Sequence, residues 1–507
     1  MINFEYIMCK KKDFVFYLCL VCTFIVATSV YAQPPTRYTS FTRVYSGNGT
    51  TVGKGVCVDY MQNIYVAGIR SDVVSATSTD AFLIKLDSTA LKVKWRVTTT
   101  NIGVDEYTTV KYSAIDSTIV VAGFTNSNTV NNNYQGVVAK YKTNGTLVWS
   151  TTIGGADLDV LNDCVINTNG DIYLTGNTTS NTNAGVDVWL IKLNAQGTTL
   201  INKNYGNAFD DSANGIALLH DTVFVVGTTT NITNDNNYYL LALNTFGDTL
   251  YSSTWGSATA NEELLKCAVG NDALHVTGMS TFNNDNNPYN ALLNTSNGSK
   301  RWEYIYPTSP TINDEGICTV YFDYNKLWAQ LIITQTFGYA GTKDFFLKVS
   351  DTNGNIIAGS SSGYKYDDVY YNACQVNDSC LIAVGTSDSY LKNGYTNLIL
   401  RKQNIYTGGS ENADSVNAIT PRTVTSTQLT TYVTPTELTI VSTIKVLGNI
   451  TTINAINILG QQVQLPIIKS YSQSVTCSIA QLNVGIYYTY ITLIDGEQVL
   501  IKFAKNE

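Results

Sequence analysis

Asp80-Ala81-Phe82-Leu83-Ile84-Lys85-Leu86 is the stretch that decides the fold, because altered copies of it recur along most of the chain. The copies lie at 135–141, 187–193, 237–243, 289–294, 344–349 and 396–402, with a period of about 52 residues. Self-similarity at this period predicts an array built from one small β unit, rather than a single irregular enzyme core.

Three further signals recur with the same period. One is a strand that ends at an anchor position, occupied by Gly68, Gly123, Gly176, Gly227, Gly278, Leu331 and Gly385. Another is a strand with a large aromatic residue, at Trp95, Trp149, Tyr251 and Trp302. The third is a strand that carries cysteine before the anchor, at Cys57, Cys164, Cys267, Cys318 and Cys374. Glycine turns such as Asn144-Gly145 follow most copies of the first stretch and are typical of β-hairpins.

Four strands in each of seven units predict an all-β fold, with a seven-bladed β-propeller over 41–406. A four-stranded sheet cannot bury both of its faces alone, so it must pack between neighbours. The seventh unit lacks its aromatic strand after Tyr406, whereas Phe41 to Tyr45 supplies such a strand before the first unit. We therefore expect residues 41–45 to complete the last blade and close the ring. An open β-solenoid is the structural alternative.

The repeats resemble a known bacterial family. Thr152-Ile153-Gly154-Gly155, Asp171-Ile172-Tyr173-Leu174-Thr175-Gly176 and the strand that begins at Asp187 are similar to the bacterial seven-bladed propeller repeats called SBBP repeats. The unit lacks the Trp-Asp ends of WD40 repeats, and only 154–155 keeps the glycine pair of kelch repeats. Leu331 departs from the pattern. The resemblance covers 41 to about 406 and implies a fold without a particular activity.

The first 32 residues read as a signal peptide. Lys10, Lys11 and Lys12 precede an apolar run from Phe14 to Val30, and Ala32 completes a small-residue cleavage site. A retained membrane anchor is the alternative, and no later stretch is long and apolar enough to cross a bilayer. Removing 1–32 takes away those three lysines with one Glu and one Asp, so the net charge of -8 becomes -9. An acidic chain with a pI near 4.9 argues against nucleic acid as a partner.

The C-terminal part loses the period and predicts a second, smaller domain. Residues 407–432 read as a linker and 433–507 as a β-sandwich. Three motifs follow in order, marked by Gly460, by Gly485 with Tyr487, and by Lys502 with Lys505. They resemble the type A C-terminal sorting domain of the type IX secretion system. That resemblance implies the secretion machinery as a partner and a secreted or outer-membrane cell-surface location. An ordinary accessory β-sandwich is the alternative.

The cysteines predict few disulfides. Five of them are expected at one equivalent position in different blades, too far apart to bridge, and therefore to serve as small apolar residues. Cys374 and Cys380 differ, because Asn377-Asp378-Ser379 between them can form a turn that sets the two side chains opposite each other. A Cys374–Cys380 disulfide is the one candidate bridge.

Signals of catalysis are few. His220 and His275 are the two histidines, they fall in different blades, and their spacing does not match metal ligands. No nucleophile elbow, phosphate loop or zinc cysteine cluster is present in the sequence. Carboxylates are plentiful, so a glycosidase-like pair of carboxylates remains an alternative.

One polar pattern follows the period. Acidic residues recur just before each cysteine strand, and their leading members are Asp105, Asp157, Asp210, Glu262, Asp314 and Asp367. In one interpretation these carboxylates cap turns and accept backbone N–H bonds between blades. In the other they form a candidate ligand face, shared with the Asn-rich loops 126–133, 178–185, 228–237 and 281–290, where hard oxygen ligands would suit Ca²⁺.

Taken together, these features predict a secreted or surface-displayed propeller that serves as a binding scaffold. Its polar loop face is expected to meet a glycan or a protein at the cell surface. A polysaccharide-acting hydrolase or lyase that uses carboxylates of the propeller face is the alternative from another class, and a spacer without a ligand is a third. The sequence predicts no cofactor beyond this candidate Ca²⁺.

Overall fold

A computed structural model describes residues 40–406 and 429–505 with short internal gaps. The predicted signal peptide, 1–32, and most of the predicted linker lie outside the described residues. The gaps are 46–48, 72–77, 100–101, 128, 130–131, 181, 183–184, 234, 259, 283–284, 307–312, 336–341, 363–365, 390–394, 435, 443–452, 458–461, 472–473 and 493–497.

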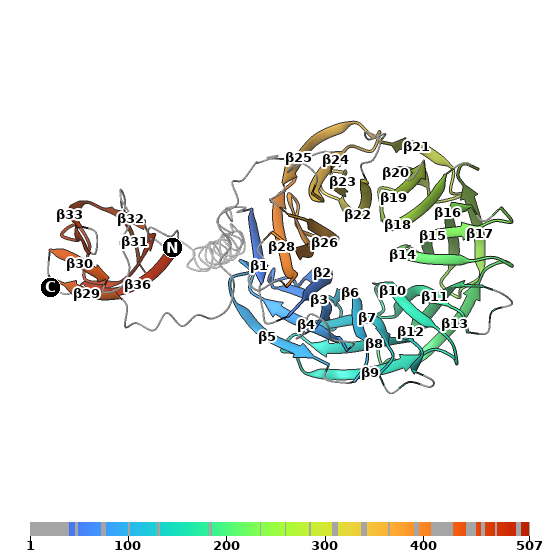
Figure 1. The fold of residues 1–507 in the computed structure, drawn as a ribbon, viewed down its shortest axis with the longest axis horizontal. Helices are drawn as coiled ribbons and strands as arrows, with labels where there is room; N and C mark the ends of the chain where they lie inside the picture. Colours follow the sequence, from blue (N-terminus) through green and yellow to red (C-terminus); the bar gives the residue numbers. More distant parts are fainter. Residues whose placement is uncertain are drawn as a thin grey trace, which may run out of the picture. The chain divides into compact units, whose positions relative to one another are not determined.

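Seven consecutive four-stranded antiparallel sheets form a ring around a central channel (Figure 1). The predicted seven-bladed β-propeller is therefore confirmed. The strands nearest the channel are β2 (Thr51–Val58), β6 (Asp105–Ser113), β10 (Asp159–Ile166), β14 (Asp211–Leu219), β18 (Asn261–Gly270), β22 (Glu315–Phe322) and β26 (Asp368–Asn377). They are the strands that carry cysteine in five of the blades.

The remaining strands follow outward in chain order. The second strands are β3 (Ile64–Arg70), β7 (Thr118–Thr125), β11 (Ile172–Thr178), β15 (Thr222–Thr230), β19 (Ala273–Phe282), β23 (Leu327–Thr334) and β27 (Cys380–Ser387). The third strands are β4 (Asp80–Leu86), β8 (Gln135–Lys142), β12 (Asp187–Leu193), β16 (Asn236–Asn244), β20 (Asp285–Asn294), β24 (Asp344–Ser350) and β28 (Asn397–Asn404). The outer strands are β5 (Val93–Thr98), β9 (Leu147–Ile153), β13 (Thr199–Tyr205), β17 (Thr249–Trp255), β21 (Lys300–Ile305), β25 (Ile356–Ser362) and β1 (Phe41–Tyr45).

The first strand of the chain closes the ring. β1 pairs with β28 in antiparallel register from Phe41 opposite Lys402 to Tyr45 opposite Leu398. It is the fourth strand of a blade whose other three strands come from the C-terminal end of the propeller. Phe41, Val44 and Tyr45 are buried there. The closure predicted from the ends of the array is therefore confirmed.

Each blade is held mainly by its neighbours. The third strands are buried on both faces, so β4 shows one partly exposed residue among six buried ones. The apolar cores lie between adjacent sheets; one core joins Tyr65 and Leu83 of the first blade to Val110 and Ile119 of the second. Packing of this kind gives every sheet a buried face on each side, which a single blade cannot provide.

The aromatic residue of an outer strand contacts the glycine turn of the next blade. Trp95 Nε1 and Lys85 Nζ both donate to Thr143 O in the turn of the next blade, each at 3.0 Å. That turn places Gly145 at a φ of 89°, where a side chain would also meet the Trp95 indole at 3.0 Å. Equivalent contacts to the next turn are Trp149 to Ala195 O, Tyr251 to Thr295 O and Trp302 to Thr352 O. Tyr205 and Tyr45 lie further along their outer strands and donate to Gly247 O and Ala90 O of the next turn. We call this set the aromatic belt.

The belt also explains one irregular blade. The last blade has no covalent turn between its third and outer strands, because its outer strand is β1. The outer strand that would dock on such a turn is β25, whose sequence Ile-Ile-Ala-Gly-Ser-Ser-Ser has no aromatic residue. The aromatic residue is thus absent from β25, the outer strand whose neighbouring blade has no such turn to accept its hydrogen bond.

The strand register corrects two alignments made from spacing. In six blades a Cβ at the anchor glycine would collide with a backbone carbonyl of the inner strand, as Gly176 would with Val160 O. In the sixth blade the anchor position is held by Ile332, which pairs with Gly316 of the inner strand. The expectation that Leu331 holds the anchor position was wrong by one residue, and the glycine has moved to the partner strand.

The cysteines do not share one position either. Each cysteine pairs with a residue of the second strand that precedes the anchor, but the number of residues between partner and anchor differs. The partner lies three residues before the anchor for Cys57 and Cys374, two before it for Cys164 and Cys267, and one before it for Cys318. All five still lie on inner strands. The predicted single ring of cysteines is therefore spread over three successive levels of the channel wall.

The C-terminal residues form two four-stranded sheets. One contains β29 (Leu429–Val433), β30 (Glu437–Ser442), β34 (Ser474–Ser478) and β33 (Ile467–Tyr471), and the other contains β32 (Gln462–Leu465), β31 (Ile453–Asn457), β35 (Gly485–Thr492) and β36 (Gln498–Lys505). Buried side chains from both sheets, among them Ile440, Val475, Ala455 and Tyr487, share one core. The C-terminal domain is thus a sandwich, and its first strand begins inside the range 407–432 that was read as linker.

The motif residues of the predicted sorting domain have these places. Gly485 begins β35 and pairs with Lys505 at the end of β36, while Lys502 lies opposite Tyr488. Tyr487 is buried and its hydroxyl donates to Asn483 O at 3.0 Å. Gly460 falls outside the described residues. Within the described part of the chain, no helix combines the length and apolar composition needed to span a bilayer.

Deleting residues 41–45 should open the propeller. Burial of Phe41, Val44 and Tyr45 contributes about 1.5–3 kcal/mol for each side chain, and the deletion also exposes β28 as an unpaired edge. We expect a large fall in the melting temperature measured by circular dichroism, together with oligomers in gel filtration. Deleting residues 35–39 instead removes the same length of chain and should leave both measurements unchanged. Equal behaviour of the two deletions would contradict the closure.

Candidate functional site

A β-bulge in every inner strand aims one side chain at the channel. The pairing with the second strand shifts by one residue in each blade, as between Leu161 and Asp163 in β10. The inserted residues are Lys54, Thr108, Asn162, Asn214, Leu265, Ile317 and Tyr371. A bulge turns its extra residue out of the regular alternation of the strand. We call these seven residues the bulge ring.

All seven residues of the bulge ring line one cavity of about 560 Å³. Lys266, Glu315, Lys343 and Asp367 line it as well. Asp367 immediately precedes its inner strand and Lys343 its third strand, and the Lys343 N–H donates to Asp367 Oδ1 at 2.9 Å. The cavity therefore lies at the end of the channel where the inner strands begin. The loops before the third strands meet the same face, as predicted, although β19 and β20 occupy most of the expected loop 281–290.

The bulge ring has a polar arc and an apolar arc. Blades one to four contribute Lys54, Thr108, Asn162 and Asn214, whereas the other three contribute Leu265, Ile317 and Tyr371. Ile333 and Val369 extend the apolar arc. One wall of the mouth cavity thus offers hydrogen-bonding groups, and the opposite wall offers aliphatic and aromatic surface together with the charged side chains Lys266, Glu315, Lys343 and Asp367.

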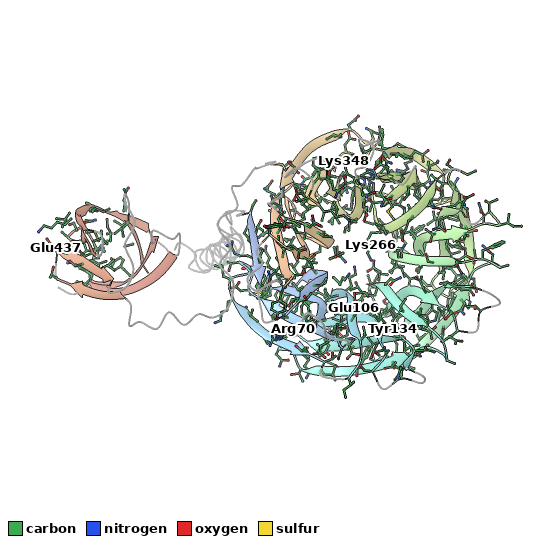
Figure 2. The ribbon with its side chains drawn as sticks, in the orientation of Figure 1. Arg70, Glu106, Tyr134, Lys266, Lys348 and Glu437 are labelled. Carbon is green, nitrogen blue, oxygen red and sulfur yellow. The ribbon has the colours of Figure 1, made fainter. Side chains whose placement is uncertain are left out.

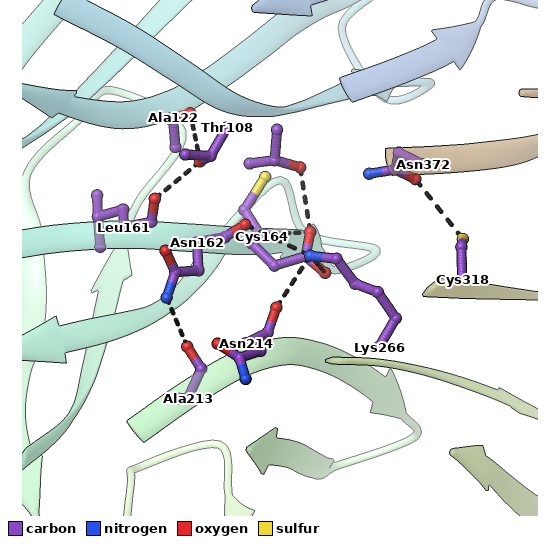
Figure 3. A network of polar contacts seen from close by, with 12 residues as sticks. Thr108, Ala122, Leu161, Asn162, Cys164, Ala213, Asn214, Lys266, Cys318 and Asn372 are labelled. Atoms are coloured by element: carbon purple, nitrogen blue, oxygen red, sulfur yellow. Dashed lines mark hydrogen bonds and ion pairs between the residues drawn. The ribbon is translucent and has the colours of Figure 1, made fainter. Parts of the chain in front are cut away.

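Contacts to the next blade hold the polar arc in place. Thr108 Oγ1 donates to Leu161 O at 2.7 Å and Asn162 Nδ2 donates to Ala213 O at 2.8 Å (Figure 3). Asn214 Nδ2 donates to Leu264 O at 2.9 Å in the same way. The three side chains repeat one contact around the ring. A site whose side chains are already fixed loses less entropy when a ligand binds.

Lys54 and Tyr371 meet across the closure of the ring. Lys54 Nζ lies 4.1 Å from the centroid of the Tyr371 ring and 3.9 Å from Glu106 Oε1. Both side chains line the mouth cavity. Burial raises the pKa of Glu106, and the nearby Lys54 ammonium opposes that rise. The charge of Lys54 is therefore partly balanced within the wall.

An ion cluster forms the floor of the mouth cavity. Asp163 is buried, with its Oδ2 at 3.1 Å from Lys266 Nζ and its Oδ1 at 3.5 Å from Lys111 Nζ. Lys266 reaches across the channel from the fifth blade, where it lies near the middle of the ring in Figure 2. Burial would raise the pKa of Asp163, but the two ammonium groups hold it below its ordinary value. Asp163 is thus a carboxylate at neutral pH.

The floor is tied to several blades at once. Lys266 Nζ also donates to Asn214 O at 2.9 Å and to Asn162 O at 3.4 Å. Thr109 Oγ1 and the Cys164 N–H donate to Asp163 Oδ1 at 3.1 Å and 2.9 Å. Below this cluster the channel continues as a second cavity of about 420 Å³. We call the two spaces the mouth cavity and the lower cavity.

The periodic acidic residues are placed differently from the bulge ring. The carboxylates that share one position at the start of the inner strands are Asp105, Asp159, Asp211, Glu262, Asp314 and Asp368, and all are buried. Asp105, Glu262 and Asp314 of the predicted set hold this position. Asp210 and Asp367 precede it by one residue and Asp157 by two. Of the predicted six, Asp367 lines the mouth cavity.

Hydrogen bonds of the fold occupy these carboxylates. Asp159 Oδ2 accepts from the Gly155 N–H at 2.7 Å, and Glu262 Oε1 from the Ser257 N–H at 2.8 Å. Asp210 Oδ1 accepts from the Val186 N–H of the preceding blade at 2.9 Å. Asp105 and Asp314 accept from threonine hydroxyls of their own blades. These are the contacts expected when the carboxylates serve the fold.

The remaining candidates can now be placed. Over the described ranges, no three His, Cys, Asp or Glu side chains gather in a way that could hold a metal ion, and the Ca²⁺ site stays a prediction. His275 is buried, stacks on Trp328 and contacts Thr319 Oγ1 at 2.9 Å through Nδ1. Burial lowers its pKa to about 3, so it is a neutral core residue. His220 occupies a turn with a φ of 50°.

The candidate disulfide was wrong. Cys374 and Cys380 are both free thiols, as are the other five cysteines in the described part of the chain. The hairpin register sets Cys380 opposite Asn377 and Cys374 opposite Ile382. The turn after Asn377 is tighter than the one assumed, so the two cysteines are not cross-strand partners.

Comparisons with known proteins leave the family open. No family model matches the chain, and no curated protein matches its sequence. The SBBP and sorting-domain assignments therefore remain predictions.

Solved propellers are similar to this chain at low identity. For the WD40 repeats of RRP9 the TM-score is 0.48 with 9% identity, covering 72% of this chain and 97% of that one. For Sqt1 from Chaetomium thermophilum the TM-score is 0.44 with 9% identity, covering 73% of this chain and 85% of that one. For the propeller domain of the Trilobed protease from Pyrococcus furiosus the TM-score is 0.40 with 8% identity, covering 72% of this chain and 98% of that one. With values this low, the fold rests on the sheet topology above, and no function follows.

At the junction of the third and fourth blades, two carboxylates face each other. At the junction of the second and third blades, Gln135 Nε2 donates to Asp159 Oδ2 at 3.5 Å. At the next junction Asp187 replaces the glutamine and faces Asp211; a Cβ on Gly206 would collide with Asp187 Oδ1 and lie 3.1 Å from Asp211 Oδ2. Asp187 Oδ1 is buried without a hydrogen-bond donor among the described residues. Burial, and then Asp211, raise the pKa of Asp187; burial also raises the pKa of Asp211.

Asp187→Asn should therefore stabilise the protein at alkaline pH. A carboxyl group with a raised pKa in the folded state contributes stability at low pH and loses it as pH rises through that pKa. Asparagine supplies the missing donor, so we expect a gain of about 1 kcal/mol in the free energy of unfolding at about pH 8 and less at about pH 5. Urea unfolding at the two pH values measures it.

The matched control makes the opposite change at the neighbouring junction. Gln135→Glu places a second carboxylate against Asp159, and it should destabilise the protein at about pH 8 more than at about pH 5. Equal effects of Asp187→Asn at both pH values would contradict the raised pKa of Asp187.

Proposed function

We propose that this protein is an exported β-propeller that binds a glycan in the mouth cavity. The proposal rests chiefly on the bulge ring, which converts one inner-strand position of every blade into a lining of a single cavity. A concave site with a few fixed polar groups on a rigid scaffold is the usual form of a small-ligand site. Export is supported by the sequence features of residues 1–32 and 433–507.

The two arcs favour a sugar ring over a charged ligand. A pyranose has an apolar C–H face and a rim of hydroxyl groups, which match the Tyr371 side and the Asn162 and Asn214 side of the cavity. Lys54 and Lys266 each have a carboxylate within 4 Å, and the other charged side chains of the wall, Lys343, Glu315 and Asp367, are also of both signs. Aromatic side chains combine large contact area with defined geometry, which suits recognition of such a face. A protein ligand that inserts a side chain is the competing partner.

A second candidate function is hydrolysis or elimination at the same site. Glu263 and Glu315 lie on neighbouring inner strands, and Glu315 lines the mouth cavity. The pKa of Glu263 is raised by burial and, in smaller part, by Glu315, while a hydrogen bond from Asn214 Nδ2 at 2.8 Å opposes the rise. A carboxyl group with a raised pKa beside a second carboxylate is the pair that glycoside hydrolysis uses.

Glycan-array binding of the full chain tests the main proposal. We expect Tyr371→Ala to weaken binding of the recognised glycan by on the order of tenfold, because it removes the aromatic surface of the cavity. Tyr324→Ala is the matched control, since Tyr324 is 79% exposed in a turn outside the cavity. Unchanged affinity in Tyr371→Ala, with the melting temperature preserved, would exclude the mouth cavity as the binding site.

The same glycans separate binding from catalysis. Release of shortened sugars by the wild-type chain, lost in Glu263→Gln, would favour the hydrolase or lyase. Binding without turnover would favour the scaffold.

Export has its own test in a bacterium that possesses type IX secretion. A chain that lacks residues 433–507 should accumulate in the periplasm, whereas the full chain should reach the surface or the medium. Cell fractionation and surface proteolysis measure the difference. Equal export of the two chains would show that the C-terminal domain is not the sorting signal.

A further inference from the structure

The lower cavity has a wall that differs from the wall of the mouth. It is lined mainly by aliphatic side chains and thiols of six inner strands, and its volume of about 420 Å³ is typical of small-molecule sites. The aliphatic part includes Val58, Ile166, Leu218 and Val269. Each of these four is partly exposed, so the channel presents apolar surface that a ligand would cover.

The thiols add to this uncharged surface. Cys57, Cys164 and Cys374 line the lower cavity and are free. Burial raises the pKa of Cys164 and of Cys374 to about 12, and it raises that of Cys57 as well. The three sulfurs are therefore neutral at physiological pH and behave as small apolar groups rather than nucleophiles.

One charge stands at the inner end of this wall. Lys111 lines the lower cavity, and its side chain is 36% exposed. Among the residues that the structure describes, no Asp or Glu lines this cavity. Burial opposes the charge of Lys111, but Asp163 beside it raises its pKa above the ordinary value, so the amine remains protonated. A cation thus faces an otherwise apolar space.

Asp163 does not balance this cation fully. It is shared with Lys266, which lies closer at 3.1 Å and also donates to two backbone carbonyls. Lys111 is 3.5 Å from the same carboxylate. Two ammonium groups and one carboxylate leave the cluster with a net positive charge. Positive charge beside apolar surface is costly unless an anion approaches it.

We propose that the lower cavity binds an amphipathic monocarboxylate, such as a medium-chain fatty acid. The carboxylate would pair with Lys111, and the aliphatic chain would extend along Val58, Ile166, Leu218 and Val269 away from the ion cluster. Charge and apolar area select the same ligand, because a neutral chain leaves Lys111 unbalanced and a small inorganic anion leaves the aliphatic wall uncovered. The site is separate from the mouth cavity, since the Asp163 cluster lies between them.

Calorimetric titration of the full chain with decanoate and with decanol tests the proposal. We expect decanoate to bind and decanol to bind on the order of tenfold more weakly, because decanol lacks the charge that pairs with Lys111. Lys111→Met keeps an apolar stem and should remove this preference. Lys54→Met makes the same change in the mouth cavity and should leave decanoate binding unchanged.

A second variant keeps the test decisive if Lys111→Met fails to fold. Ala268 lines the lower cavity, so Ala268→Phe should block decanoate while glycan binding at the mouth is retained. Equal affinity of the wild type for decanoate and decanol would overturn the proposal. So would decanoate binding that survives in a folded Lys111→Met chain, or binding that is lost in Lys54→Met instead.

Discussion

The contact between neighbouring blades is the constraint on which the structure depends. A four-stranded sheet with apolar residues on both faces has no stable form alone, so each blade needs a neighbour on either side. The aromatic belt fixes the spacing of these neighbours at the outer rim, where one carbonyl of the next turn accepts from an indole and a lysine. Because the ring must close, the first strand has to return to the last blade, and β1 does so.

The fold could be predicted because its signals sit at positions that the blade contact keeps the same. Trp95, Lys85 and Gly145 belong to separate strands and turns, yet all three meet at one junction, which is why they repeat together. The absence of an aromatic residue in β25 follows the same rule. Ring closure could also be predicted, because the sequence has one extra strand before the first blade and lacks the outer strand of the last blade.

The site could be predicted only in part, because residue counting does not detect β-bulges. A bulge inserts a residue without changing the apolar and polar character of its neighbours. Counting also placed the five cysteines at one level and Leu331 at the anchor, where the register shows three levels and Ile332, because the turns between the inner and second strands differ in length from blade to blade. It also gave no sign of Asn162 or Tyr371 as cavity residues. The periodic acids were visible in the sequence, but their regularity reflects the fold.

Function in such a ring is therefore to be sought where the repeat breaks. Positions that keep their chemistry in most blades, such as the buried acids and the aromatic belt, are occupied by contacts that every junction requires. The bulge ring changes from lysine to amide to aliphatic to tyrosine around the channel, although its backbone geometry is constant. Lys111, Asp163 and Lys266 likewise have no counterparts of the same charge at equivalent levels of the other blades. Seven equivalent backbones with unlike side chains produce an asymmetric channel, and an asymmetric channel can hold one ligand in one orientation.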